Sequence, residues 1–148
     1  HPGRAEAAPM EILRILEKSG AMMDRVIMGH LDRTISSVPK LKEIAATGCV
    51  LEWDLFGNEV SFYQPSDFDM PSDAQRMDFI RAMIDDGIED RIVISHDICT
   101  KHRLVRYGGH GYGYILEHIV PRMRNRSFTE EEIYSLLQGN ATRLLTIS

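Results

Sequence analysis

The sequence predicts an α/β fold built on a parallel sheet. Three short apolar runs, at 24–30, 49–55 and 90–97, alternate with stretches that have helical periodicity. The turns that lead into these runs are short, whereas long loops rich in polar residues and glycine follow the second and third runs. Long loops after the strands place function at the carboxyl ends of the strands, so we expect the site there.

The first third of the chain is expected to form a helix, a strand and a second helix. Residues 9–19 place apolar side chains on one face, and Gly20 ends this helix. Residues 24–30 are an apolar run that ends in polar residues, which is typical of a strand buried on both faces of a parallel sheet. A helix over 39–47 follows and is stopped by Gly48.

The middle third is expected to repeat this order. A strand at 49–55 is followed by a long loop at 56–70 that is rich in Asp, Ser, Pro and Tyr. A helix over 72–86 begins with Ser and Gln at the spacing of a capping box. The strand at 90–97 repeats the pattern of the first strand, with Asp-Arg, an apolar stretch and then a residue able to bind a metal.

The last third holds a glycine-rich loop and two helices. The loop at 98–113 has a glycine density too high for a regular helix or strand, and we expect it to lie over a site. A helix at 114–124 follows. Thr129 and Glu132 form a second capping box, which begins a last helix that we expect to end near Gly139.

Composition excludes several classes of function. The chain has 148 residues, of which 43% are hydrophobic and 26% charged, and its formal net charge is −5. A net acidic chain is a poor match for phosphates, so we expect no nucleic-acid partner. No apolar run approaches the ~20 residues of a membrane span, so we expect no membrane partner. Cys49 and Cys99 lack metal-binding spacing, and the chain opens without a basic-then-apolar leader, which together predict a cytoplasmic protein.

Three side chains that can bind a metal stand at strand ends. His30 ends the first strand, Asp97 ends the third, and His1 stands where a preceding strand would just have ended. Imidazole and carboxylate groups bind Zn²⁺ and similar ions in catalytic sites. A single histidine after a strand more often caps a turn, so spacing alone leaves both interpretations open. Adjacent strand residues face opposite ways, so only one of His96 and Asp97 points into the site.

Five motifs occur in order along the chain. They are His-Pro-Gly-Arg at 1–4, Gly-His-Leu-Asp-Arg-Thr at 29–34, Leu-Glu-Trp-Asp-Leu-Phe-Gly at 51–57, Ser-His-Asp-Ile-Cys-Thr-Lys at 95–101 and Tyr-Gly-Gly-His-Gly-Tyr at 107–112. These motifs resemble the phosphotriesterase-related proteins, in the phosphotriesterase family of the amidohydrolase superfamily. The resemblance implies the C-terminal half of a (β/α)₈ TIM barrel, from the end of strand five through strand eight. Residues 1–148 would then be part of a single metal-dependent hydrolase domain whose N-terminal half is absent from this chain.

The resemblance also implies a ligand set for two divalent metal ions, with zinc as the expected metal. It makes His1 and His30 ligands of one ion. It makes Asp97 a ligand of the other ion and the acid–base partner of a bridging hydroxide, with His96 outside the barrel mouth. The family's remaining ligands are a His-x-His pair and a bridging carboxylate, which lie upstream of this chain.

The function implied by the resemblance is metal-assisted hydrolysis of an ester, lactone, amide or phosphoester bond in a small molecule. Phosphotriesterases proper have an acidic residue and a histidine where this chain has Arg33 and Leu55. We therefore expect lactone or amide hydrolysis rather than efficient organophosphate hydrolysis. The alternative is a small-molecule-binding protein with little turnover on the same scaffold. The other expected partners are the N-terminal half of the barrel and a second copy in a homodimer.

Further side chains are candidates for substrate contact. His110, Tyr112 and Phe56 are predicted to bind the substrate; the alternatives are that the first two only pin the glycine-rich loop and that Phe56 packs beneath the pocket. Asp32 either orients a metal ligand or pairs with a cation. The basic residues in 101–106 either attract an anionic group of the substrate or form a solvated rim.

Overall fold

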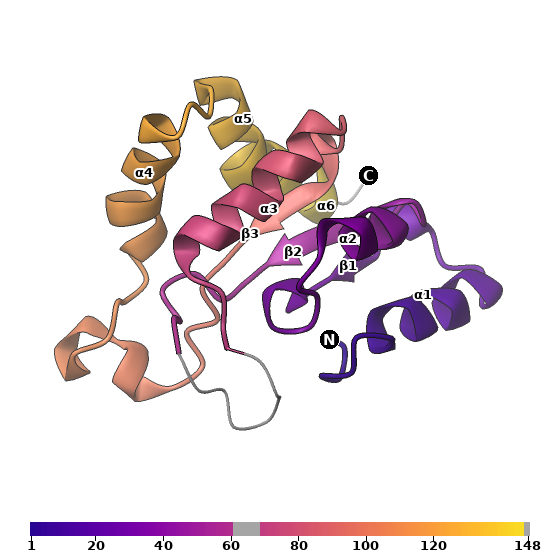
Figure 1. The fold of residues 1–148 in the computed structure, drawn as a ribbon, viewed down its shortest axis with the longest axis horizontal. Helices are drawn as coiled ribbons and strands as arrows, with labels where there is room; N and C mark the ends of the chain where they lie inside the picture. The colour runs from indigo at the N-terminus through magenta and orange to yellow at the C-terminus, as the bar shows by residue number, and fades with distance from the viewer. Residues whose placement is uncertain (61–68, 147–148) are drawn as a thin grey trace.

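Three parallel strands form the centre of the molecule (Figure 1). The computed structural model describes residues 1–60 and 69–146. The strands lie in the order β1 (Ile27–Met28), β2 (Val50–Trp53) and β3 (Ile92–Ile94), and each pairs in parallel with its neighbour. The strands alternate with helices along the chain, which confirms the predicted α/β fold with a parallel sheet.

The α-helices of the described residues are α1 (Ala8–Lys18), α2 (Val38–Ala45), α3 (Asp73–Asp85), α4 (Val120–Asn125), α5 (Glu130–Tyr134) and α6 (Asn140–Leu145), with a π-helical stretch at Ile115–Ile119 before α4. The helices α1, α2, α3 and α5 begin within one residue of the predicted positions, and both predicted capping boxes are formed. Of the predicted loop at 56–70, residues 61–68 lie outside the described part of the chain. No helix within the described ranges is long and apolar enough to cross a membrane.

The first and third strands begin later than predicted because their Asp-Arg pairs do not join the sheet. Residues 23–25 and 89–91 form single 3₁₀ turns that lead into β1 and β3. Arg25 donates to the carbonyls of Arg143 and Leu144, and Arg91 donates to a carbonyl at the end of α2. The arginines therefore satisfy carbonyl groups at helix ends, which have no partner within their own helix.

The last helical segment does not end at Gly139, as predicted, but continues through α6. Gly139 keeps a right-handed helical φ of −56°, and the π-helical stretch Ser135–Gly139 joins α5 to α6. Nδ2 of Asn140 donates to the carbonyls of Glu89 and Ile92, at 2.8 Å each. These bonds dock α6 against β3, and they outweigh the helix-breaking tendency of glycine, which is worth about 1 kcal/mol relative to alanine.

The two faces of the sheet differ in what covers them. Leu51 and Trp53 of β2 share one hydrophobic cluster with apolar residues of α2 and α3, helices that lie along the same side of the strands in Figure 1. Glu52, on the other face, is only partly buried, and Ile27 of β1 is 40% exposed. A parallel sheet that is covered by helices on one face and is partly exposed on the other is consistent with part of a barrel.

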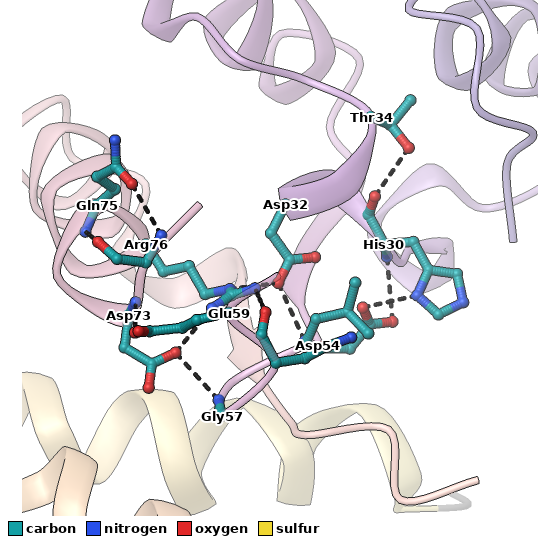
Figure 2. Close-up of polar contacts among 12 residues, drawn as sticks. His30, Asp32, Thr34, Asp54, Gly57, Glu59, Asp73, Gln75 and Arg76 are labelled. Carbon is teal, nitrogen blue, oxygen red and sulfur yellow. Dashed lines mark hydrogen bonds and ion pairs between the residues drawn. The ribbon is translucent and has the colours of Figure 1, made fainter. Parts of the chain in front are cut away.

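A fully buried arginine on α3 joins the segments that follow β1 and β2 (Figure 2). Arg76 donates from Nε to Oδ2 of Asp32 at 2.9 Å, from Nη1 to Oδ1 of Asp73 at 2.7 Å and from Nη2 to the carbonyl of Asn58 at 2.8 Å. Oδ2 of Asp32 also accepts from the backbone N–H of Leu55 at 3.0 Å. The network therefore fixes the ends of two neighbouring strands relative to one helix.

The same network reaches the segment that follows β3. Oδ2 of Asp73 accepts a hydrogen bond from the hydroxyl of Tyr114 at 2.7 Å, and its Oδ1 accepts from the backbone N–H of Gly57 at 3.0 Å. Burial and the neighbouring Asp73 carboxylate raise the pKa of Tyr114 to about 12, so its hydroxyl stays a donor. One carboxylate thus connects the loop after β2 with the helical segment after the glycine-rich loop.

The network predicts a large loss of stability when its cation is removed. In the intact protein, Arg76→Met leaves the carboxylates of Asp32 and Asp73 buried without their cation, which typically costs about 3–5 kcal/mol. Urea denaturation measures this loss as a fall in the free energy of unfolding. The control Lys42→Met removes an exposed ion pair with Asp86 and is expected to cost about 1 kcal/mol or less. Equal losses in the two variants would contradict the role assigned to Arg76.

Candidate active site

The three predicted metal ligands line one cavity at the carboxyl ends of the strands. The rings of His1 and His30 meet edge-on, with their centroids 4.1 Å apart. The cavity has a volume of about 240 Å³ and is lined by His1, Arg4, His30, Arg33, Leu55, Asn58, Asp97, Cys99 and Arg103. The start of the chain and the segments after β1 and β3, which are far apart in the sequence, therefore bring these three side chains to the same place.

His30 is held by both oxygens of a single carboxylate (Figure 2). Its backbone N–H donates to Oδ2 of Asp54 at 3.1 Å, and its Nδ1 lies 2.8 Å from Oδ1. An ionised carboxylate only accepts hydrogen bonds, so we assign the ring proton to Nδ1, which leaves the lone pair of Nε2 available. The backbone of His30 is left-handed, with φ 54°, and its carbonyl accepts from the hydroxyl of Thr34 at 2.9 Å. These contacts fix the direction of the ring.

The structure separates the roles of His96 and Asp97. Asp97 lines the cavity, has a left-handed φ of 43°, and places Oδ2 3.6 Å from Nη1 of Arg103. Arg103 also donates to the carbonyl of Asp97 at 2.5 Å. His96 instead donates from Nε2 to the carbonyl of Tyr112 at 3.0 Å. Asp97 is therefore the side chain of this pair that faces the candidate site.

Burial changes the proton affinity of the groups around His30. It raises the pKa of Asp54 to about 6, and it raises the pKa of Glu52 to about 7, with the negative charge of Asp54 adding to the second shift. Burial and the positive charge of Arg33 lower the pKa of His30. The imidazole of His30 is therefore kept neutral, which is the form that binds a metal ion.

The described residues supply donors of the right chemistry but not a complete ligand set. Within residues 1–60 and 69–146, no group of three or more His, Cys, Asp or Glu side chains is arranged to hold a metal ion. His1 and His30 offer ring nitrogens side by side, and Asp97 offers a carboxylate in the same cavity. These residues fit a metal centre only as a partial set that further ligands must complete.

The three predicted substrate contacts lie elsewhere. Phe56 has no exposed surface and packs in the core, with the guanidinium carbon of Arg76 5.9 Å from its ring centroid, so it does not reach a substrate in this arrangement. The ring of His110 lies against Gly57, where a Cβ would come within 2.7 Å of Cδ2. Tyr112 is 67% exposed. None of the three is among the described residues that line the cavity.

Two residues that shape the site are not indicated by the sequence motifs. Asp54 orients His30, and Arg76 anchors Asp32. The signal for Asp54 was its place two residues after Glu52, which puts both carboxyl groups on one face of a strand. Asp32 pairs with a cation, Arg76, and reaches the site only through the backbone of Leu55.

The raised pKa of Glu52 predicts a pH-dependent stability. The folded protein keeps the proton of Glu52 up to about pH 7, whereas an unfolded glutamate loses it near its ordinary pKa of 4.5. The folded state is therefore destabilised as the pH rises through this window. We expect Glu52→Gln to raise the free energy of unfolding more at pH 8 than at pH 5, as measured by denaturant titration of the intact protein. The same gain at both pH values would contradict this expectation.

Known proteins resemble this chain over nearly its whole length. It is 53% identical over 148 residues to the N-acetyltaurine hydrolase of Dictyostelium discoideum, a match that covers 99% of this chain and 40% of the relative. It is also 53% identical over 147 residues to the phosphotriesterase-related protein of Nematostella vectensis, covering 99% of this chain and 42% of the relative. The chain thus spans about two fifths of the length of these curated relatives.

The three-dimensional comparison agrees with the sequence comparison. A resiniferatoxin-binding protein from Rhodobacter sphaeroides superposes with a TM-score of 0.89 at 29% identity, over 97% of this chain and 40% of that protein. The neighbours in structure are TIM-barrel proteins, so the three-stranded parallel sheet is consistent with part of such a barrel. The sequence profile of the phosphotriesterase family matches residues 1–145. The chain therefore belongs to the phosphotriesterase family.

Proposed function

We propose that this chain supplies the C-terminal part, from the end of strand five through strand eight, of a barrel that hydrolyses the amide bond of a small N-acyl compound. The observation that carries the proposal is the convergence of His1, His30 and Asp97 in one cavity at the strand ends. The choice of an amide follows the relative named N-acetyltaurine hydrolase, which shares about half of its residues with this chain over the matched region. The substrate class is therefore an amide that releases a carboxylic acid and an amine.

The proposed cofactor is a pair of divalent metal ions, with zinc as the metal. When bound, such ions lower the pKa of a water molecule and polarise the carbonyl under attack. His1 and His30 would hold one ion and Asp97 the other, together with ligands from the part of the protein that precedes this chain. The Nδ1–H bond to Asp54 favours this role, because it leaves the opposite nitrogen of His30 free to bind.

Asp97 has the position of the acid–base group. In the proposed reaction, the water oxygen forms a bond to the acyl carbon while the carboxylate of Asp97 takes a proton. Asp97 then gives this proton to the amide nitrogen as the carbon–nitrogen bond breaks. Arg103 donates to the carbonyl of Asp97 and lies near its carboxylate, so it holds the residue toward the cavity.

Two cavity residues argue against efficient hydrolysis of organophosphates. Arg33 and Leu55 stand where the phosphotriesterases proper have an acidic residue and a histidine, and both line the cavity. A guanidinium and an alkyl side chain cannot relay a proton near neutral pH. We therefore assign the proton transfer to Asp97 rather than to Arg33 or Leu55.

A second candidate is a protein that binds a small apolar molecule with little turnover. It is favoured by the name of the Rhodobacter sphaeroides protein, which describes binding of resiniferatoxin. Metal analysis of the intact protein separates the two candidates. The hydrolase should hold about two divalent ions per chain, whereas a folded protein that lacks metal and binds apolar ligands would support the second candidate.

The role of Asp97 predicts a specific kinetic defect. In the intact, zinc-loaded protein, Asp97→Asn should lower kcat for N-acetyltaurine by about 10²- to 10⁴-fold, because the variant cannot accept the proton. Steady-state release of taurine measures the effect. The control Asp90→Asn changes an exposed carboxylate at the other end of β3 and should leave kcat unchanged. Near-normal turnover by Asp97→Asn would remove Asp97 from the mechanism.

The contact between Asp54 and His30 predicts a defect in metal affinity. Asp54→Asn weakens the carboxylate bond that sets the ring of His30, and partners of this kind typically contribute about 10- to 100-fold to metal affinity. Competition with a chelator of known zinc affinity measures the change in the intact protein. Asp86→Asn, which alters an exposed carboxylate on the surface, is the matched control. Unchanged zinc affinity in Asp54→Asn would contradict the orienting role.

A further inference from the structure

The cavity that holds the candidate ligands is lined by an excess of positive charge. Its described lining residues include three arginines, Arg4, Arg33 and Arg103, and one carboxylate, that of Asp97. The remaining lining residues are imidazole, amide, thiol and alkyl side chains. A cavity with this charge balance favours a ligand that carries negative charge.

Arg33 lies where it can contact a negatively charged small molecule next to the side chains of the proposed metal centre. It ends the 3₁₀ turn Leu31–Arg33, which begins directly after His30, and only 4% of it is exposed. Nη2 donates to the carbonyl of Pro2 at 3.4 Å. A guanidinium has five N–H groups in a planar fork, which matches two oxygens of a carboxylate or a sulfonate. Arg33 can therefore bind an anionic group in addition to its contacts within the protein.

The backbone on both sides of Arg33 is anchored. The preceding Asp32 is bonded to Arg76 and to the N–H of Leu55, at 2.9 and 3.0 Å. The hydroxyl of the following Thr34 donates to the carbonyl of His30 at 2.9 Å. A side chain on an anchored turn loses little conformational entropy when it binds, which favours selective recognition.

The other two cavity arginines are less suited to this role. Arg103 is engaged by the carboxylate and the carbonyl of Asp97, which makes it a positioning residue for that side chain. Arg4 is exposed and lies before α1, outside the helices and strands of the described residues. Arg33 alone combines burial, an anchored turn and direct proximity to His30.

We propose that Arg33 determines substrate specificity by binding the anionic end of the substrate while the amide lies toward His1, His30 and Asp97. This inference rests on the proposed amide hydrolysis and adds the substrate class: N-acyl compounds with a sulfonate or carboxylate a short chain away from the amide. N-acetyltaurine has this form, since a two-carbon chain separates its amide from its sulfonate. Arg33 is thus the reason that an acidic amide is selected over a neutral one.

The test compares substrates that differ only in the anionic end. N-acetyltaurine, N-acetyl-β-alanine and the uncharged primary amide of N-acetyl-β-alanine are hydrolysed by the intact, zinc-loaded enzyme and by Arg33→Gln. The variant should lower kcat/KM for the two anions by about 10- to 100-fold, mainly through KM, because a charge-assisted hydrogen bond is worth about that much. The neutral amide should change by much less. The ratio of the wild-type kcat/KM values for N-acetyltaurine and N-acetyl-β-alanine shows whether the site prefers a sulfonate or a carboxylate.

Two further variants separate recognition from folding. Arg33→Lys keeps the charge but loses the planar fork, so it should recover part of the activity on the anions. Arg14→Gln removes an exposed arginine of α1 and should behave as the wild type. Calorimetry of taurine binding to the zinc-loaded enzyme is the second readout, and Arg33→Gln should weaken this binding by a similar factor.

The outcomes distinguish this inference from the proposed function. A wild-type enzyme that hydrolyses none of the three amides refutes the amide hydrolase itself. A wild-type enzyme that hydrolyses the neutral amide as well as the anions overturns the inference and leaves the hydrolase intact. Equal losses on all three substrates in Arg33→Gln would also overturn it, since they indicate a structural role. If Arg33→Gln does not fold, Arg33→Lys provides the test. An unchanged kcat/KM of Arg33→Lys for N-acetyltaurine and N-acetyl-β-alanine would overturn the role of the planar guanidinium group.

Discussion

The buried guanidinium of Arg76 is the interaction on which the geometry of the site depends. It bonds Asp32 after β1, the carbonyl of Asn58 after β2 and Asp73 at the start of α3. Asp73 in turn accepts from Tyr114, in the segment after β3. A buried charge is tolerated only where its partners are complete, so these segments cannot shift independently of one another. The strand ends that carry the candidate ligands are therefore held in one arrangement.

Two carboxyl groups near the strand ends stabilise different parts of the site. Asp32 holds the backbone through Leu55, whereas Asp54 holds the ring of His30. Gly29 makes this crowding possible, because a Cβ there would lie 2.9 Å from an oxygen of Glu52 and 3.0 Å from an oxygen of Asp54. The burial of His30 and the positive charge of Arg33 lower the pKa of its imidazole, and the carboxylate of Asp54 fixes the direction of the ring. Of these three acids, none is among the described residues that line the cavity, whereas Arg4, Arg33 and Arg103 are.

Much of the fold followed from local patterns in the sequence. Apolar periodicity located the helices and the strands, and Ser72 and Thr129 marked two helix starts because a capping box is made by residues three positions apart. The end of the last helix could not be predicted in this way. Gly139 is a helix-ending residue by propensity, but Asn140 bonds carbonyls near β3, about fifty residues earlier in the chain. Local helix propensity cannot predict a contact between residues so far apart in the sequence.

The sequence by itself determined which residues stand at strand ends, and so it identified His1, His30 and Asp97 as candidates for one site. It also carried the family motifs that the profile match confirms. Residue spacing left the choice between His96 and Asp97 open, and the tertiary structure shows that Asp97 lines the cavity, as the family resemblance implied. Only the tertiary structure shows that Phe56 packs in the core and that Asp54 orients His30. The physical reason is that local periodicity indicates where each strand lies along the chain. The direction of a side chain depends instead on backbone angles and on partners that folding brings together.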